Sequence, residues 1–300
     1  MKYFLARLIW GLPALMLGLL SVSCLAQLNP KLEYILFAKG PFGSSALRIP
    51  EYSGLTEAPD LLVLGSSTCK RSVDPRPFEQ HRLVAFNLCS SSQTLFNSER
   101  LLSWSLEDGK RPETILLDIY PSVWGLEGVE SARDLTINHN LVYQGAFQRM
   151  AWATGDIPTI LKASYFGLKR RLVPHGEVLE GKVPFTYIPG GLSYTLMPPV
   201  DSVECVPDTC ELNRTQRRAF ERIRRTCEEE GIQLLLVNPP QLCEEVFEKP
   251  EVMEGLPWIE GNDWPLAKVD TLYYDDHHLR GVGAELYSEW LAGQVGALLD

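Results

Sequence analysis

The sequence lacks an excess of positive charge, and this absence excludes nucleic acid as an expected partner. Its 28 Lys and Arg residues are outnumbered by 38 Asp and Glu residues, which gives a formal net charge of −10 at pH 7 and a pI near 5.1. Binding to a phosphate backbone needs a clustered positive surface. The chain also has no internal repeat, and its 23 Gly and 21 Pro residues are close to ordinary usage. Solenoid, collagen-like and low-complexity architectures are therefore excluded as well.

Cys-x-x-Cys motifs are also absent, so the sequence does not predict a zinc site built on cysteine pairs. Six of the seven cysteines follow the N-terminal segment, at positions 69, 89, 205, 210, 227 and 243. An even number fits an oxidising compartment. Cys205 and Cys210 are spaced to close a small loop. Cys69 and Cys89 each follow a predicted strand and could meet, although spacing alone does not assign the pairs.

Residues 1–26 have the pattern of an export signal. Lys2 and Arg7 precede an uncharged, largely apolar run over residues 8–28. This order of a basic and then an apolar region is typical of a secretory signal peptide, and the run is also long enough for a membrane anchor. The segment that ends at Cys24 resembles a bacterial lipoprotein box, in which the cysteine is lipidated. We therefore expect an exported protein that is periplasmic or otherwise extracytoplasmic, and either anchored to the membrane through its N-terminus or released.

Short apolar runs alternate with helical patterns beyond the N-terminal segment, which predicts a parallel sheet covered by helices on both faces. The predicted strands cover residues 60–66, 83–88, 114–120, 232–237 and 269–274. The predicted helices cover residues 93–106, 211–229 and 283–299. The expected fold class is thus three-layer α/β/α. Residues 27–57 are interpreted as a linker and residues 58–300 as the domain, with an insertion after the third strand at about 125–210.

Two polar motifs follow predicted strands, at the edge where open parallel sheets bind ligands. The first is the Gly-Ser-Ser turn over residues 65–67, before a helix start whose free N–H groups can stabilise an oxyanion. The second is the Asp-Asp-His-His run over residues 275–278, before the last helix. Within it only Asp275 and His278 have the three-residue spacing that lets a carboxylate hold Nδ1–H while Nε2 deprotonates a serine.

Together the two motifs resemble those of the SGNH/GDSL hydrolase superfamily, and the ending DDHHLRGVGAELYSEWLA is similar to the usual ending of that family. The segments LVLGSSTCKRSVDPRPFE, AFNLCSSSQT and ILLDIYPSVW resemble a membrane-associated branch that contains D-alanyl-lipoteichoic acid biosynthesis and alginate O-acetyltransferase-like proteins. The resemblance covers roughly residues 58–124 and 211–298 and leaves the insertion unmatched. It implies a flavodoxin-like SGNH fold.

The resemblance also implies a role for each matching residue. Ser67, the second residue after the glycine, would be the nucleophile. His278 would be the general base, and Asp275 would orient it. The backbone N–H groups of Ser67, Cys89 and Ser90 would form the oxyanion hole.

The implied activity is serine-dependent acyl ester hydrolysis or O-acyl transfer on a cell-envelope glycan. No cofactor is expected, because the triad supplies the nucleophile and the proton transfer together. For a transferase, the resemblance implies a polytopic membrane acyltransferase as the partner that delivers the acyl group across the bilayer.

Two alternatives stay open. The asparagine of the third family motif is replaced by the Asp118-Ile-Tyr-Pro121 segment, which favours a non-catalytic glycan-binding or scaffold subunit of an acylation complex. A metal-dependent hydrolase would need Asp118 and the 275–278 run to converge on one ion. Lys70 and Arg71 lie beside the nucleophile and are interpreted as solvated surface charges rather than as ligands of an anion.

Overall fold

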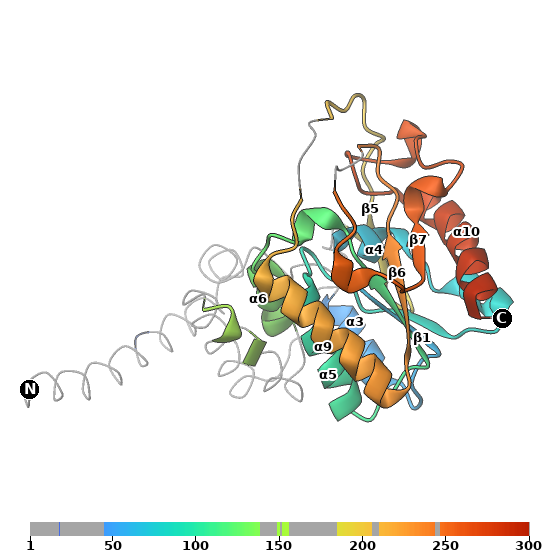
Figure 1. The fold of residues 1–300 in the computed structure, drawn as a ribbon. Coiled ribbons are helices and arrows are strands. Elements are labelled where there is room, and N and C mark those ends of the chain that lie inside the picture. The colour runs from blue at the N-terminus through green and yellow to red at the C-terminus, as the bar shows by residue number, and fades with distance from the viewer. Residues whose placement is uncertain are drawn as a thin grey trace, which may run out of the picture.

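The computed structural model describes residues 18, 45–138, 149–150, 152–155, 185–205, 210–243 and 247–299. In this part of the chain a five-stranded parallel sheet lies between two layers of helices, which confirms the predicted three-layer α/β/α fold (Figure 1). The strands are β1 Leu61–Leu64, β2 Ala85–Asn87, β3 Thr114–Asp118, β6 Gln233–Asn238 and β7 Trp258–Glu260. They are arranged as β2-β1-β3-β6-β7, the strand order of flavodoxin-like folds.

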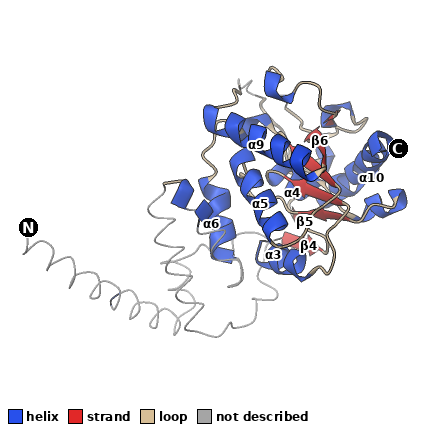
Figure 2. Cartoon of the chain, turned by 60° about the horizontal axis from the view of Figure 1, so that its bottom comes forward, coloured by secondary structure: helices blue, strands red, loops and turns tan. Residues whose placement is uncertain are grey.

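The strands are apolar on both faces because helices cover both faces of the sheet. In β1, Leu62 and Leu64 pack into one core, and Leu61 and Val63 pack into the other. The first core is covered by α3 Ser45–Gly54, α5 Leu95–Glu107 and α9 Arg214–Glu230. The second is covered by α4 Ser67–Ser72, the 3-10 helix η1 Arg76–His81 and α10 Gly281–Leu299. Figure 2 shows α5 and α9 on one side of the strands and α10 on the other.

Local signals explain where the long helices begin and end. The Thr94 side chain caps α5, and Asn97 completes a capping box with it. Asn213 caps α9 by accepting a hydrogen bond from the backbone N–H of Gln216 at 2.9 Å. Gly231 ends α9 with a φ of 64°, the left-handed conformation that glycine adopts at helix ends. Both helices were predicted close to these bounds.

The edge of the sheet differs from the prediction. Residues 269–274 do not form its fifth strand, because they contain the 3-10 helix η6 Asp270–Leu272 and a single antiparallel bridge between Tyr273 and Leu279. The fifth strand is β7, which pairs with β6. Its three residues are too few to show a period in the sequence.

The segment interpreted as a linker contains α3, which belongs to the domain. Ile49 and Tyr52 of α3 are fully buried in the first core. The Arg48 guanidinium is also buried, and it donates to the carbonyl oxygens of Gly191 and Cys89. The domain therefore includes residues before 58, and α3 supports the loop that follows β2.

The predicted insertion is described in parts. It contains α6 Val129–Asn138 and an antiparallel hairpin of β4 Phe185–Ile188 and β5 Leu192–Thr195. The hairpin turn lies against the end of β2, because the Asn87 backbone N–H donates to the Gly190 carbonyl at 2.7 Å. Gly191 has a φ of 108°, and a Cβ there would lie 2.0 Å from the Asn87 carbonyl oxygen, so this contact requires glycine. The remaining short 3-10 helices are η2 Pro121–Val123, η4 Glu251–Met253 and η5 Gly261–Asp263.

The predicted signal peptide or anchor over residues 1–26 lies outside the described residues, apart from Gly18. Among the helices in the described ranges, none is both long and apolar enough to cross a membrane. Export therefore stays a prediction.

Candidate active site

The first motif forms a tight turn between β1 and α4. Ser66 caps α4, since its side chain accepts a hydrogen bond from the backbone N–H of Thr68 at 3.4 Å. Ser67 is the first residue of the helix, and a helix start leaves its N–H groups without intrahelical acceptors. The Ser66 side chain is buried, whereas that of Ser67 is half-buried, so Ser67 presents the accessible hydroxyl.

Asp118, at the end of β3, lies beneath this turn. Its Oδ2 accepts hydrogen bonds from the Ser66 backbone N–H and hydroxyl, both at 2.7 Å, and from the Thr68 hydroxyl at 3.0 Å. Its Oδ1 accepts from the Tyr120 backbone N–H at 2.7 Å. Gly65 permits this approach, because a Cβ there would lie 2.1 Å from the Asp118 Cβ. Burial raises the pKa of the Asp118 carboxyl, while these hydrogen bonds oppose the rise. Asp118 therefore holds the nucleophile turn in place.

The second motif is a loop that precedes α10. Oδ1 of Asp275 accepts hydrogen bonds from the backbone N–H groups of His277 at 3.1 Å and His278 at 2.7 Å. This Asx-type turn fixes the backbone around the imidazole. The Tyr274 ring stacks on the His278 ring with centroids 5.4 Å apart and planes 4° apart. Backbone and ring contacts together leave the imidazole a single orientation.

The two motifs meet in space. Nε2 of His278 lies 2.8 Å from Oγ of Ser67, and Nδ1 of His278 lies 2.7 Å from Oδ2 of Asp275. These contacts have the order and the lengths of a Ser-His-Asp triad, in which the acid orients the base and the base contacts the nucleophile. The structure thus brings together the three residues that the sequence singled out as catalytic.

The electrostatics suit a base that is neutral at neutral pH. Burial lowers the pKa of His278 to about 4, against the opposing hydrogen bond to Asp275. Burial alone would raise the pKa of Asp275, but the hydrogen bond from His278 and the nearby imidazoles lower it to about 2. At neutral pH the imidazole is therefore neutral and the carboxylate beside it is charged, which are the protonation states that a Ser-His-Asp triad requires.

The oxyanion donors expected from the loop after β2 are not free. The Cys89 backbone N–H donates to Oδ1 of Asn87 at 3.1 Å, and the Ser90 backbone N–H donates to the Gly65 carbonyl at 3.1 Å. Both groups are used in holding the loop against β1 and α4, which corrects their assignment to the oxyanion hole. Of the three expected donors, the N–H of Ser67 is the one that has no such partner among the residues that the structure describes.

Ser92, two residues further along this loop, has a backbone conformation that the sequence did not indicate. Its φ of 47° is uncommon for a residue other than glycine, and such backbone conformations cluster at functional sites. Within the described residues its backbone N–H has no acceptor. A glycine would have signalled this turn, but a serine in a run of three serines does not.

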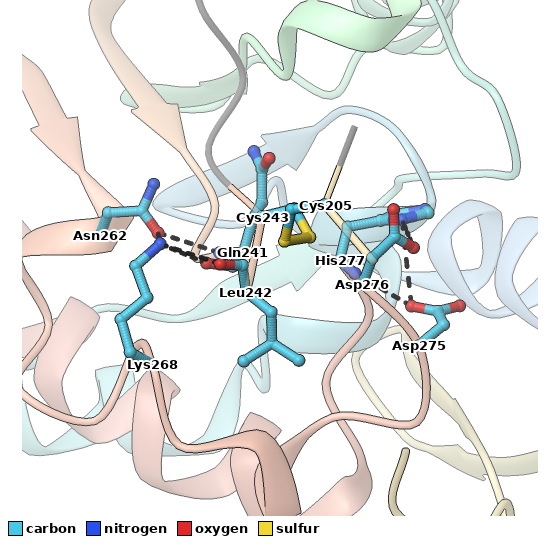
Figure 3. Close-up of a disulfide and its surroundings, with 9 residues drawn as sticks. All are labelled: Cys205, Gln241, Leu242, Cys243, Asn262, Lys268, Asp275, Asp276 and His277. Carbon is cyan, nitrogen blue, oxygen red and sulfur yellow. Dashed lines mark hydrogen bonds and ion pairs between the residues drawn. A yellow bond between two sulfur atoms is a disulfide. The ribbon is translucent and has the colours of Figure 1, made fainter. Parts of the chain in front are cut away.

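A disulfide joins Cys205 to Cys243 beside the second motif (Figure 3), with the two Cα atoms 5.3 Å apart. Cys205 therefore does not close the small loop with Cys210 that the spacing allowed, and Cys210 is not part of this disulfide. The carbonyl of Asp276 accepts a hydrogen bond from the Leu242 backbone N–H at 2.9 Å. The loop that contains Cys243 is thereby hydrogen-bonded to the loop that carries Asp275 and His278.

Cys69 and Cys89 do lie next to one another, as buried free thiols. Burial first, and then the neighbouring Cys89 thiol, raises the pKa of Cys69 well above its ordinary value. The Cys69 thiol therefore stays protonated, and both side chains pack as small apolar groups of the second core.

The hypothesis of a metal-dependent hydrolase requires Asp118 as a ligand together with the residues of the 275–278 run, and Asp118 does not join them. In the described part of the chain, the ligand atoms of Asp275, His277 and His278 lie within 4.8 Å of one another and could hold an ion. Asp118 does not belong to this group, because its oxygens face the nucleophile turn. Nδ1 of His277 bonds to Asp276 at 2.6 Å, and Nδ1 of His278 bonds to Asp275. An ion would have to replace the hydrogen bond that orients the base.

Lys70 is not a solvated surface charge, which corrects the sequence interpretation. Its side chain is 3% exposed, and Nζ donates to the Ser91 hydroxyl at 3.2 Å. Arg71 is half-buried, with its guanidinium over the Tyr274 ring at 5.2 Å and Nη1 donating to the Thr195 hydroxyl at 2.5 Å. Two cations thus lie within one helical turn of the nucleophile.

No family model matches this chain, and no curated protein matches it.

Proposed function

We propose that this protein is an SGNH-type serine esterase or O-acyltransferase that acts on an acyl ester of a cell-envelope glycan. The observation that carries the proposal is the 2.8 Å contact between Oγ of Ser67 and Nε2 of His278, with Asp275 on the opposite ring nitrogen. The strand order and the position of both loops at the carboxyl edge of the sheet support it. The glycan substrate is a proposal from the family resemblance alone.

In the proposed reaction, Oγ of Ser67 attacks the acyl carbonyl carbon, and its proton passes to Nε2 of His278. A C–O bond forms while the carbonyl π electrons move onto oxygen. Collapse of this intermediate expels the alcohol, which takes the proton from His278. Water or a glycan hydroxyl then attacks the acyl-enzyme by the reverse sequence, which completes hydrolysis or transfer. Asp275 stays ionised throughout.

The proposals on cofactors and partners follow from the proposed triad chemistry. The triad needs no cofactor, because it supplies nucleophile and proton transfer. A transferase would take its acyl group from a polytopic membrane acyltransferase, and the N-terminal segment would keep the two proteins at the same membrane.

The test is covalent labelling of the purified full-length protein with a fluorophosphonate probe, together with turnover of p-nitrophenyl acetate. We expect the label on Ser67 by peptide mass spectrometry. Ser67→Ala should abolish labelling and lower turnover at least about 10³-fold. Ser103→Ala is the matched control, since Ser103 lies on α5 and only bonds to the Glu99 carbonyl of its own helix.

A non-catalytic glycan-binding subunit is the second candidate, and Asp118 favours it. The carboxylate stands where the resembled family carries an asparagine that donates to the oxyanion, so this site lacks that amide donor. A folded protein that neither reacts with the fluorophosphonate nor turns over the ester, alone or with its membrane fraction, would establish the second candidate.

A further inference from the structure

Lys70 is a buried ammonium whose surroundings lack a paired carboxylate. Its side chain is 3% exposed, and its one hydrogen bond within the described residues is to the Ser91 hydroxyl at 3.2 Å. No carboxylate in the described ranges lies within ion-pair distance of it. Burial of a charge without a counter-ion is unfavourable, because the charge loses its hydration and gains no partner in exchange. Packing alone would be served better by an apolar side chain, so a function at this position accounts for the charge.

Lys70 and Ser91 belong to two different elements that meet at the turn that presents Ser67. Lys70 is three residues after Ser67 on α4, and residues with this spacing lie on the same face of a helix. Ser91 follows Ser90, whose backbone N–H donates to the Gly65 carbonyl, so this part of the loop runs beside the nucleophile turn. The Ser91 hydroxyl is half-buried and therefore accessible to a bound ester.

We propose that the Ser91 hydroxyl, polarised by Lys70, donates a hydrogen bond to the oxyanion of the Ser67 reaction. A lysine ammonium can donate but cannot accept, so Oγ of Ser91 accepts from Lys70 and directs its own proton to another acceptor. The proton stays on Ser91 and the ammonium keeps its three protons; only the charge that develops on the carbonyl oxygen is stabilised. This inference rests on the proposed function and supplies the side-chain donor that Asp118 does not provide.

The charges around Lys70 help to set the pH range over which its side chain is an ammonium that can polarise Ser91. Arg48 on α3 and Arg71 on α4 disfavour the ammonium, whereas Asp134 and Glu130 on α6 favour it. Burial is the largest influence, and the pKa of Lys70 is lowered to about 8. The ammonium is therefore mostly present at neutral pH and is lost as the pH rises above about 8.

The experiment compares full-length Lys70→Met, Ser91→Ala and the double variant on p-nitrophenyl acetate, with the Ser67→Ala background subtracted. Each single change should lower kcat by about 10²-fold with little change in KM, as for loss of one oxyanion donor. The double variant should be no more than a few-fold worse than either single variant, because both changes remove one donor. Lys110→Met is the control, since Lys110 is also buried but pairs with Asp108.

The pH profile separates an electrostatic role from a packing role. Wild-type kcat should fall above about pH 8, and Lys70→Met should lose this alkaline limb. A Lys70→Met or Ser91→Ala variant with kcat within twofold of wild type would overturn the inference while leaving the triad in place. A wild-type protein that shows neither labelling nor turnover overturns the proposed function as well. Ser91→Ala removes one oxygen from a half-buried side chain, so it keeps the test decisive if Lys70→Met does not fold.

Discussion

The Asp118 carboxylate accepts one hydrogen bond from the backbone N–H of Ser66 and another from its hydroxyl, each at 2.7 Å. It lies at the carboxyl end of β3, on the buried side of the turn that presents Ser67. An acceptor at this place cannot stabilise an oxyanion, but it can fix the residue next to the nucleophile. Asp118 therefore supports the turn that presents Ser67.

Asp118→Asn should destabilise the fold by about 1–3 kcal/mol and lower kcat. The amide NH₂ would face N–H and O–H groups that now donate hydrogen bonds to the carboxylate, and these donors would lose their acceptor. Denaturant unfolding and ester turnover would measure the two effects. Asp263→Asn, on the exposed part of η5, should change the free energy of unfolding by less than about 0.5 kcal/mol. Equal stability of the two variants would show that Asp118 does not support the turn.

Gly65→Ala should be among the most damaging single changes outside the triad. Its new Cβ would lie 2.1 Å from the Asp118 Cβ, so the turn or β3 must move. We expect a loss of about 1–3 kcal/mol or more in the free energy of unfolding, together with loss of fluorophosphonate labelling. Gly54→Ala is the matched control, because a Cβ there meets no atom within 4 Å. A Gly65→Ala protein with wild-type melting and labelling contradicts the packing described for this turn.

The acid limb of the pH profile should report His278. Burial lowers its pKa from 6.5 to about 4, so kcat/KM should stay level down to about pH 5 and fall below about pH 4. Since the folded pKa lies below the ordinary value, the neutral imidazole contributes stability above about pH 6.5 that is lost as the pH falls toward 4. Circular dichroism at each pH separates unfolding from protonation of the base. An activity midpoint near 6.5 in the folded protein would mean that the imidazole is solvated.

Reduction of the disulfide should weaken both the fold and the site. Cys205 and Cys243 are 38 residues apart in the sequence, and a cross-link of this span contributes about 2–4 kcal/mol. Cys243→Ser should therefore lower the melting temperature and also reduce kcat, because the loop that includes Leu242 bonds to the Asp276 carbonyl. Cys210→Ser changes a cysteine outside this disulfide and serves as control. Activity that survives reduction unchanged would show that the triad loop keeps its position without the cross-link.

The layered fold and the pairing of Asp275 with His278 follow from local patterns, whereas the choice of Ser67 as the third residue came from the family resemblance. Strand-length apolar runs with small residues after them predict buried parallel strands, whatever their neighbours are. The spacing of Asp275 and His278 is a property of one turn, and the position of Ser67 depends on the strand and helix that flank it. Such patterns can be read from the sequence because the physics behind them involves residues a few positions apart.

Long-range contacts decided the rest. Helix α3 is found where a linker was expected, because its apolar side chains pack into the first core. Strand β7 forms because its backbone pairs with that of β6. Three further features depend on segments that are far apart in the chain. They are the pairing of Cys205 with Cys243, the hydrogen bonds that hold the loop of Cys89 and Ser90, and the burial of Lys70. Neither hydrophobic periodicity nor residue spacing in the neighbouring sequence predicts these contacts. The sequence and the resemblance it carries thus indicated Ser67, Asp275 and His278, and the tertiary structure decided that these side chains meet and which backbone groups around them are already hydrogen-bonded.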